Sequence, residues 1–301
     1  MTDRRRALHL PFLGALLIAL AAFTPDGVRA DDVPPASATE TPAPRTPYLL
    51  RITAPDDLDD LLSTYLDLAR FRTDPALADV TEAEIRRLVA ATPAQAQSLL
   101  ETRGYFNPVI RITTDEGSPP TITLQVDPGE RTRVSRATVE VQGDIVERAE
   151  QGDVRDRQLL AEIQAGWRLR EGRPFSQGWW NSEKSELLGR LRTDGYPAAA
   201  WSGTAAEVDA PRNTVRLFAV ADSGPLYRFG PTSIEGLSLH REEAVSNLLT
   251  FQPGQRYTEK QVLDLQERLQ RSGLFESASV IVDPDPATAE AAPVAITVRE
   301  L

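Results

Sequence analysis

A turn that joins a helical stretch to a strand occurs three times along this 301-residue chain, and its regular spacing limits the possible folds more than any other feature. In each copy a glycine ends the helical stretch, and an aromatic or apolar residue follows within two positions. The three copies are Arg103-Gly104-Tyr105-Phe106, Asp194-Gly195-Tyr196-Pro197 and Ser272-Gly273-Leu274-Phe275. Their glycines are 91 and 78 residues apart. Because self-similarity at a fixed period is typical of tandem structural units, we expect three small units in a row.

Two further landmarks recur in the same order and set the boundaries of the units. Asp127-Pro128-Gly129 and Asp222-Ser223-Gly224 each precede a strand-like stretch. The segments Gly172–Ser176 and Gly254–Thr258 lie 82 residues apart, and each precedes a helical stretch. These landmarks predict units at residues 48–128, 129–224 and 225–301.

The hydrophobic pattern changes in the same order within each unit, and the third unit shows it most clearly. Residues 227–237 read as a strand, residues 240–251 and 258–272 have apolar residues at helical spacing, and alternating strands follow at about 278–282 and 294–298. The predicted fold class is therefore α+β, with three tandem β-α-α-β-β domains. Each domain would have a three-stranded sheet with helices on one face.

The other two units follow the pattern with one departure. In the second, Ala137, Val139 and Val141 alternate in the first strand, and helices are expected around 159–163 and 180–191. The first unit begins with a strand at 48–52. A single amphipathic helix then carries apolar residues at helical spacing: Leu58, Leu61, Leu62, Tyr65, Leu66 and Ala69. The departure is residues 81–104, where Pro93 predicts two helices or a kinked one.

The first 47 residues are not expected to belong to the fold. Three arginines at positions 4–6 precede an apolar run at 7–23, and Val28-Arg29-Ala30 offers small residues for a signal peptidase. We predict a signal peptide at 1–30, cleaved between Ala30 and Asp31. A membrane anchor is the alternative, although the run is shorter than the ~20 residues that span a bilayer. Residues 31–47 are rich in proline, which predicts a disordered linker.

Composition argues against several classes of function. The chain has a net charge of −11, and the predicted leader carries +2, so the remainder carries −13. This balance predicts no nucleic-acid partner, because phosphate binding needs a basic face. There is no cysteine, and the only histidines are His9 and His240. We therefore expect no enzyme, and no catalytic, metal-binding or cofactor-binding residues.

On these features the chain resembles the POTRA domains of bacterial outer-membrane assembly factors. The residues that carry the resemblance are LLSTYLDLARFR at 61–72, SLLETRGYFNPVI at 98–110 and LQERLQRSGLFESASVIVDP at 265–284. Three such domains after an export signal are most similar to the periplasmic part of the TamA family, the translocation and assembly module subunits of the BamA and TamA group.

The resemblance implies a periplasmic scaffold or receptor for the insertion or secretion of outer-membrane proteins and autotransporters. Its implied partners are unfolded outer-membrane protein or autotransporter clients and an inner-membrane-anchored, TamB-like subunit. In that family a membrane barrel follows the last POTRA domain. The sequence ends at Leu301 on the last predicted strand, so we expect no barrel in this chain. A barrel encoded separately would be a further partner and would place the protein at the outer membrane. The alternative is a POTRA-bearing periplasmic adaptor, of the cell-division or two-partner-secretion type, without assembly activity.

The expected functional surface is an edge of a sheet, because unpaired main-chain groups there can pair with an extended client segment. The resemblance places the second strand of each unit at an edge, which gives candidates at 109–113, 198–206 and 278–282. We consider Ala278, Ser279, Val280, Ile281 and Val282 the foremost candidate. The alternative is that these edges only border solvent or a neighbouring unit. Trp179 is a candidate interface residue, since exposed aromatic residues anchor interfaces.

Overall fold

The computed structural model of the chain describes residues 48–73 and 81–301. The predicted leader, its cleavage site at Ala30 and Asp31, and the predicted linker lie outside the described residues. The described residues all fall within one compact unit, Pro44–Leu301. Within them, none of the helices combines the length and the apolar character that crossing a membrane requires.

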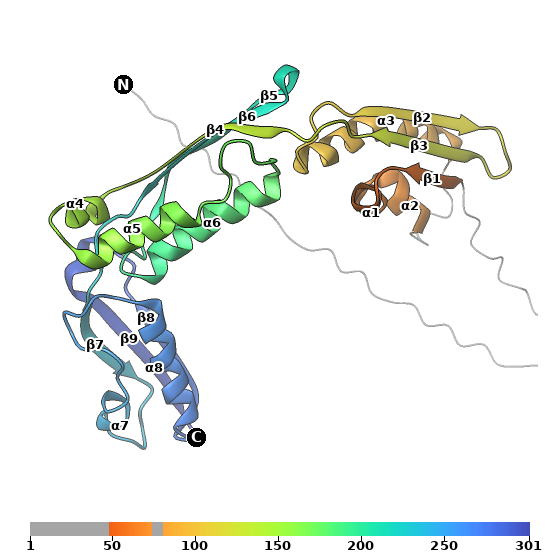
Figure 1. The fold of residues 1–301 in the computed structure, drawn as a ribbon. Coiled ribbons are helices and arrows are strands. Elements are labelled where there is room, and N and C mark those ends of the chain that lie inside the picture. Colours follow the sequence, from red (N-terminus) through yellow and green to blue (C-terminus); the bar gives the residue numbers. More distant parts are fainter. Residues whose placement is uncertain (1–47, 74–80) are drawn as a thin grey trace, which may run out of the picture. The chain divides into compact units, whose positions relative to one another are not determined.

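The described residues form three sheets of three strands, one in each predicted unit (Figure 1). The first has the order β1-β3-β2, the second β4-β6-β5 and the third β7-β9-β8. In each sheet the first strand runs parallel, and the second antiparallel, to the last strand at the centre. The strands are β1 (Leu49–Thr53), β2 (Val109–Asp115), β3 (Thr121–Asp127), β4 (Arg133–Gln142), β5 (Ala200–Asp209), β6 (Thr214–Asp222), β7 (Phe229–Glu235), β8 (Phe275–Val282) and β9 (Ala292–Glu300). The predicted α+β fold class is confirmed.

Helices cover one face of each sheet, as Figure 1 shows for α5 and α6 beneath the second sheet. The helices are α1 (Asp56–Tyr65), α2 (Asp67–Thr73), α3 (Glu82–Thr102), α4 (Asp144–Glu150), α5 (Val154–Gly166), α6 (Gln177–Thr193), α7 (Glu243–Ser246) and α8 (Glu259–Arg271), with 3₁₀ turns at Ala210–Arg212 and Pro286–Ala291. Alternate residues of each central strand are buried beneath the helices; in β9 these are Val294, Ile296 and Val298. Each unit therefore has its own hydrophobic core.

The first unit corrects one prediction about its helices, and around Pro93 it has one helix where the sequence left two helices or a kinked one open. The expected single helix over 58–69 is two helices, because Leu66 has an extended backbone between α1 and α2. The break turns Tyr65 outward, where its side chain is 60% exposed, while Leu66 itself is fully buried. In contrast, α3 runs through Pro93 as one unbroken helix. The missing N–H of Pro93 costs one helical hydrogen bond.

The third and second units each contain one further difference. The expected helix over 240–251 is reduced to α7, with four residues. The loop before α7 is held instead by the Glu300 carboxylate, which accepts hydrogen bonds from the backbone N–H groups of Ser238, Leu239 and His240. In the second unit the short helix α4 was not predicted. Seven residues are too few for a helical period to stand out in the sequence.

Candidate functional site

The second strand of every sheet lies at an edge, where the resemblance placed it. Strand β2 contains the candidate segment 109–113, β5 begins at Ala200 and so contains most of 198–206, and β8 contains 278–282. Each of these strands has a ladder partner on one side only. Their outer main-chain groups are therefore available for pairing with a further strand.

The ladder between β8 and β9 determines which groups of the candidate segment are free. The N–H of Asp283 donates to the carbonyl of Pro293 at 2.9 Å, so Asp283 faces β9. Because N–H directions alternate along a strand, Ser279 and Ile281 also face β9. The outward groups are those of Ala278, Val280 and Val282. The side chains of Ala278 and Val280 point into the core, and that of Ile281 is exposed on the open face of the sheet.

Trp179 lies in the first turn of α6, at the position where the side chain of Ser176 accepts a hydrogen bond from its N–H. Its ring is 45% exposed, and the Arg131 guanidinium lies over it at 4.7 Å. Tyr65, Tyr105 and Trp179 line the same hollow, whose volume is about 590 Å³. Trp179, the predicted interface residue, thus lies near other aromatic side chains. That it binds a partner protein stays a prediction.

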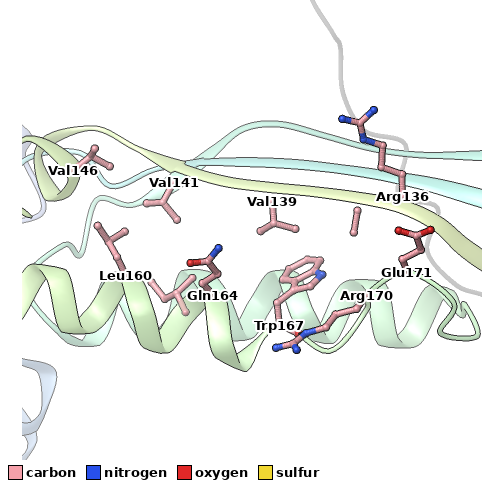
Figure 2. A pocket seen from close by; sticks show the side chains of 11 residues that line it. Arg136, Val139, Val141, Val146, Leu160, Gln164, Trp167, Arg170 and Glu171 are labelled. Carbon is pink, nitrogen blue, oxygen red and sulfur yellow. The ribbon is translucent and has the colours of Figure 1, made fainter.

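A groove between β4 and α5 was not predicted from the sequence (Figure 2). Val139 and Val141 point from the strand towards the helix, and Leu160 and Trp167 point back from the helical side. The groove has a volume of about 450 Å³. The alternating sequence pattern identified the strand. The groove depends on the distance between the strand and the helix packed on it, and no local sequence pattern gives that distance.

The junctions between the units use the glycine turns that first revealed the repeats. The N–H of Thr132 donates to the carbonyl of Gly104 at 2.8 Å, and the N–H of Tyr227 donates to that of Gly195 at 2.7 Å. Both glycines have positive φ, at 91° and 95°. The same bond therefore joins the first unit to the second and the second to the third.

A buried charge cluster reinforces the second junction. Asp156, at the start of α5, pairs with Arg148 at 3.0 Å and with Arg256 of the third unit at 2.7 Å. Burial opposes the charge on Arg256, but the adjacent Asp156 carboxylate and the negative charge of Asp194 together raise its pKa. Burial also raises the pKa of Tyr196, and the Asp156 carboxylate raises it further. These carboxylates therefore help to hold the two units together.

His240 and the acidic residues at the start of α1 occupy structural positions. His240 contacts Glu300 through its Nδ1 at 2.9 Å. Asp56, Asp57 and Asp59 occupy the first turn of α1, where negative charge is favourable. Across residues 48–73 and 81–301, no group of three or more acidic or histidine side chains is placed to hold a metal ion.

Two segments of the chain match POTRA family models. Residues 53–128 match the model described as POTRA domain TamA domain 1, and residues 227–301 match the POTRA model described as surface antigen variable number repeat. The second unit lies between them and has the same strand order as its neighbours. The chain belongs to the POTRA-domain proteins. The first and third units are POTRA domains by these matches, and the second has the same strand order; in chain order the three units are called POTRA domains 1, 2 and 3.

The solved structures to which the chain is similar share little of its sequence. POTRA domains 3–5 of BamA from Haemophilus influenzae are 16% identical, with 84% of this chain and 95% of that chain covered and a TM-score of 0.45. POTRA domains 1–3 of Omp85 from Anabaena are also 16% identical, with 84% and 94% covered and a TM-score of 0.30. CdiB from Acinetobacter baumannii is 12% identical, with 57% and 30% covered and a TM-score of 0.32. The family matches and the strand order, not these superpositions, carry the assignment.

Proposed function

We propose that this chain is a periplasmic module that receives extended polypeptide segments during the assembly or secretion of outer-membrane proteins. Support comes from the two POTRA matches, one of them to a domain of TamA. The clients would be unfolded outer-membrane proteins or autotransporters, and a TamB-like subunit anchored in the inner membrane would be a partner. No catalytic step is required of the chain in this role.

The observation that carries the proposal is the open edge of β8. Its outward N–H and C=O groups at Ala278, Val280 and Val282 can pair with the main chain of any extended segment, whatever its side chains. A receptor for many different clients needs this tolerance. The exposed Ile281 side chain on the open face of the sheet adds an apolar contact beside the edge.

Proline substitutions at neighbouring positions of β8 test the proposal, because proline removes one N–H. Ala278→Pro removes an outward donor and should abolish binding of an unfolded client peptide while the domain stays folded. Ser279→Pro removes a donor of the internal ladder and should destabilise POTRA domain 3. Binding is measured by titration followed by NMR shifts, and folding by circular dichroism. Unchanged client binding by a folded Ala278→Pro variant would rule out pairing at this edge.

A further inference from the structure

The hollow lined by Tyr65, Tyr105 and Trp179, the aromatic hollow, is formed by helices and turns. It lies between α1, the C-terminal end of α3 and the N-terminal end of α6, and its volume of about 590 Å³ is within the range of ligand-binding sites. None of its lining residues belongs to a strand of residues 48–73 and 81–301. It therefore offers no strand edge, and a ligand there must be recognised through side chains and the start of α6.

Exposed aromatic rings give the aromatic hollow its apolar surface. The side chain of Tyr65 is 60% exposed and that of Trp179 is 45% exposed. Trp179 also lines a second hollow of about 370 Å³, together with Leu169 and Arg173. Its ring therefore stands between two hollows, where a ligand can pack against it from either one. Exposed aromatic rings of this kind anchor protein interfaces.

The charged side chains that line the two hollows are Asp57, Arg103, Arg131, Arg168, Arg173 and Glu183. Arg168 pairs with Glu183 at 2.6 Å and with Glu186 at 3.1 Å. Glu186 also pairs with Arg190 at 2.9 Å, so this network is balanced. Three guanidinium groups remain against one carboxylate.

The three remaining arginines have no carboxylate partner. Within residues 48–73 and 81–301, no ion pair includes Arg103, Arg131 or Arg173. Arg131 donates from its Nε to the carbonyls of Arg103 and Phe175 at 2.8 and 3.0 Å, and its guanidinium lies over the ring of Trp179 at 4.7 Å. The one carboxylate, Asp57, precedes Tyr65 by eight residues, or about 12 Å along α1.

Two further facts indicate that the ligand is acidic. The N-terminal end of α6 borders the aromatic hollow, and the dipole of a helix favours negative charge at that end. The chain as a whole has a net charge of −11, so a local excess of unpaired arginines is unusual in it. A surface of this kind is complementary to a segment that carries carboxylates.

We propose that the aromatic hollow between POTRA domains 1 and 2 binds an acidic, proline-rich segment of a partner protein in the polyproline II conformation. Such a segment has no internal main-chain hydrogen bonds and needs no ladder, and its proline rings dock in aromatic-lined grooves. Its carboxylates would pair with Arg103, Arg131 and Arg173. The inference goes beyond the proposed function, because it concerns a different site and a recognition mode without strand pairing.

The probe is a capped, dye-labelled peptide of three Pro-Pro-Glu repeats, and its binding is followed by fluorescence anisotropy. Polyproline II has three residues per turn, so the glutamates form one ridge and the prolines the other two. Proline has no N–H, so this probe cannot form a strand ladder. We expect it to bind the parent chain about tenfold or more tightly than Pro-Pro-Lys repeats or the flexible Gly-Ser-Glu repeats. Equal binding of Pro-Pro-Glu and Gly-Ser-Glu would overturn the proposal.

Aromatic variants from both domains test the site. Trp179→Ala and Tyr65→Ala each remove an exposed ring and should weaken binding of the Pro-Pro-Glu probe about tenfold or more. Phe218→Ala is the matched control, because Phe218 is also 45% exposed but lies on β6, outside both hollows. It should bind like the parent, and circular dichroism checks that all three variants are folded. Parent-like binding by folded Trp179→Ala and Tyr65→Ala would overturn the proposal.

A pair of arginine variants tests the charge preference. Arg103→Gln should weaken binding of the Pro-Pro-Glu probe several-fold and leave the weak binding of Pro-Pro-Lys unchanged or stronger. Arg87→Gln is the control, because Arg87 is exposed on α3 about 24 Å along the helix from Arg103. It should bind like the parent. Equal binding of the probe by Arg103→Gln and Arg87→Gln would overturn the assignment of the carboxylates to these arginines.

The same titrations separate this inference from its alternatives and from the proposed function. Ala278→Pro should bind the Pro-Pro-Glu probe like the parent, even where it loses an unfolded client peptide. Binding that appears only after removal of residues 31–47 would assign the site to the chain's own proline-rich segment and overturn a partner protein. Failure of the probe with normal client binding would refute the inference and leave the proposed function intact.

Discussion

The Asp156 carboxylate and the Arg256 guanidinium form a 2.7 Å ion pair that joins POTRA domain 2 to POTRA domain 3. The Asp156 side chain is fully buried, and that of Arg256 is 10% exposed. Asp156 also pairs with Arg148 from its own domain, so one carboxylate lies between two guanidinium groups. Removing one member of such a cluster leaves the other buried charges without full compensation.

Arg256→Leu should therefore destabilise the chain strongly, by about 3–5 kcal/mol. Arg155→Leu is the control, because Arg155 pairs with Asp194 at 2.8 Å but is half exposed, and its loss should cost less than about 1 kcal/mol. All four tryptophans lie in POTRA domain 2, so their fluorescence in urea follows the unfolding of that domain. Equal unfolding midpoints for the two variants would contradict the structural role of the buried pair.

The glycines of the last two turns should respond differently to alanine. Gly273 has φ 73° with open space around a new Cβ, so Gly273→Ala should cost only the backbone strain, about 1 kcal/mol. At Gly195, φ is 95° and a Cβ would lie 2.6 Å from Leu226 and 2.7 Å from Arg256. Gly195→Ala should therefore cost more than Gly273→Ala in thermal unfolding followed by circular dichroism. A larger effect at Gly273 would mean that the junction does not depend on Gly195.

The adjacent tryptophans of α6 offer a matched pair for the candidate interface. Trp180 is 3% exposed and packs edge-on against Trp167 at 5.9 Å, so Trp180→Ala should cost about 3–5 kcal/mol. Trp179→Ala removes only an exposed contact with Arg131 and should cost about 1 kcal/mol or less. If Trp179 is an interface residue, its substitution should weaken partner binding in a pull-down with the purified partner while stability stays near that of the parent. Parent-like partner binding would remove it as a candidate.

Glu300 should make the stability of POTRA domain 3 depend on pH. Hydrogen bonds from the Ser238 side chain and from the N–H groups of Leu239, His240 and Ser238 hold the pKa of its carboxyl well below the usual value. Because the folded-state pKa is depressed, the stabilisation is present above the unfolded value of about 4.3 and is lost as pH falls through the folded value. Glu300→Gln should thus unfold more easily at pH 7 and show a smaller loss of stability on acidification. Ser238→Ala should reduce the same pH dependence. The measurement is the urea midpoint of each variant across the acid range. Midpoints that fall with pH as steeply as those of the parent would contradict the role of Glu300.

Local sequence patterns predicted the repeated unit well because they encode its strands and turns directly. Alternation identified β9 through Val294, Ile296 and Val298, and the turn glycines have the positive φ that a helix end requires. The prediction of one helix over 58–69 was wrong because the apolar spacing continues across Leu66 although the backbone does not. The expected helix over 240–251 was wrong for a different reason. Leu248 and Leu249 pack against the core as a helical pattern predicts, but the backbone is an α-helix only over Glu243–Ser246.

Features that depend on distant residues could not be predicted in the same way. Asp156 and Arg256 are 100 residues apart, and neither stands out among the other charged residues of the chain. The β4–α5 groove depends on the separation between a strand and a helix. The open edge of β8 followed from the family resemblance, but the outward direction of Ala278, Val280 and Val282 came only from the ladder.

Amide hydrogen exchange in β8 tests most directly whether the chain receives extended polypeptide by main-chain pairing. In the free chain the outward amides of Ala278, Val280 and Val282 should exchange faster than the inward amides of Ser279 and Ile281. With a saturating, unfolded client peptide, the account predicts that exchange slows at the three outward amides and changes little at the two inward ones. Unchanged exchange at Ala278, Val280 and Val282 while the peptide is bound would contradict it.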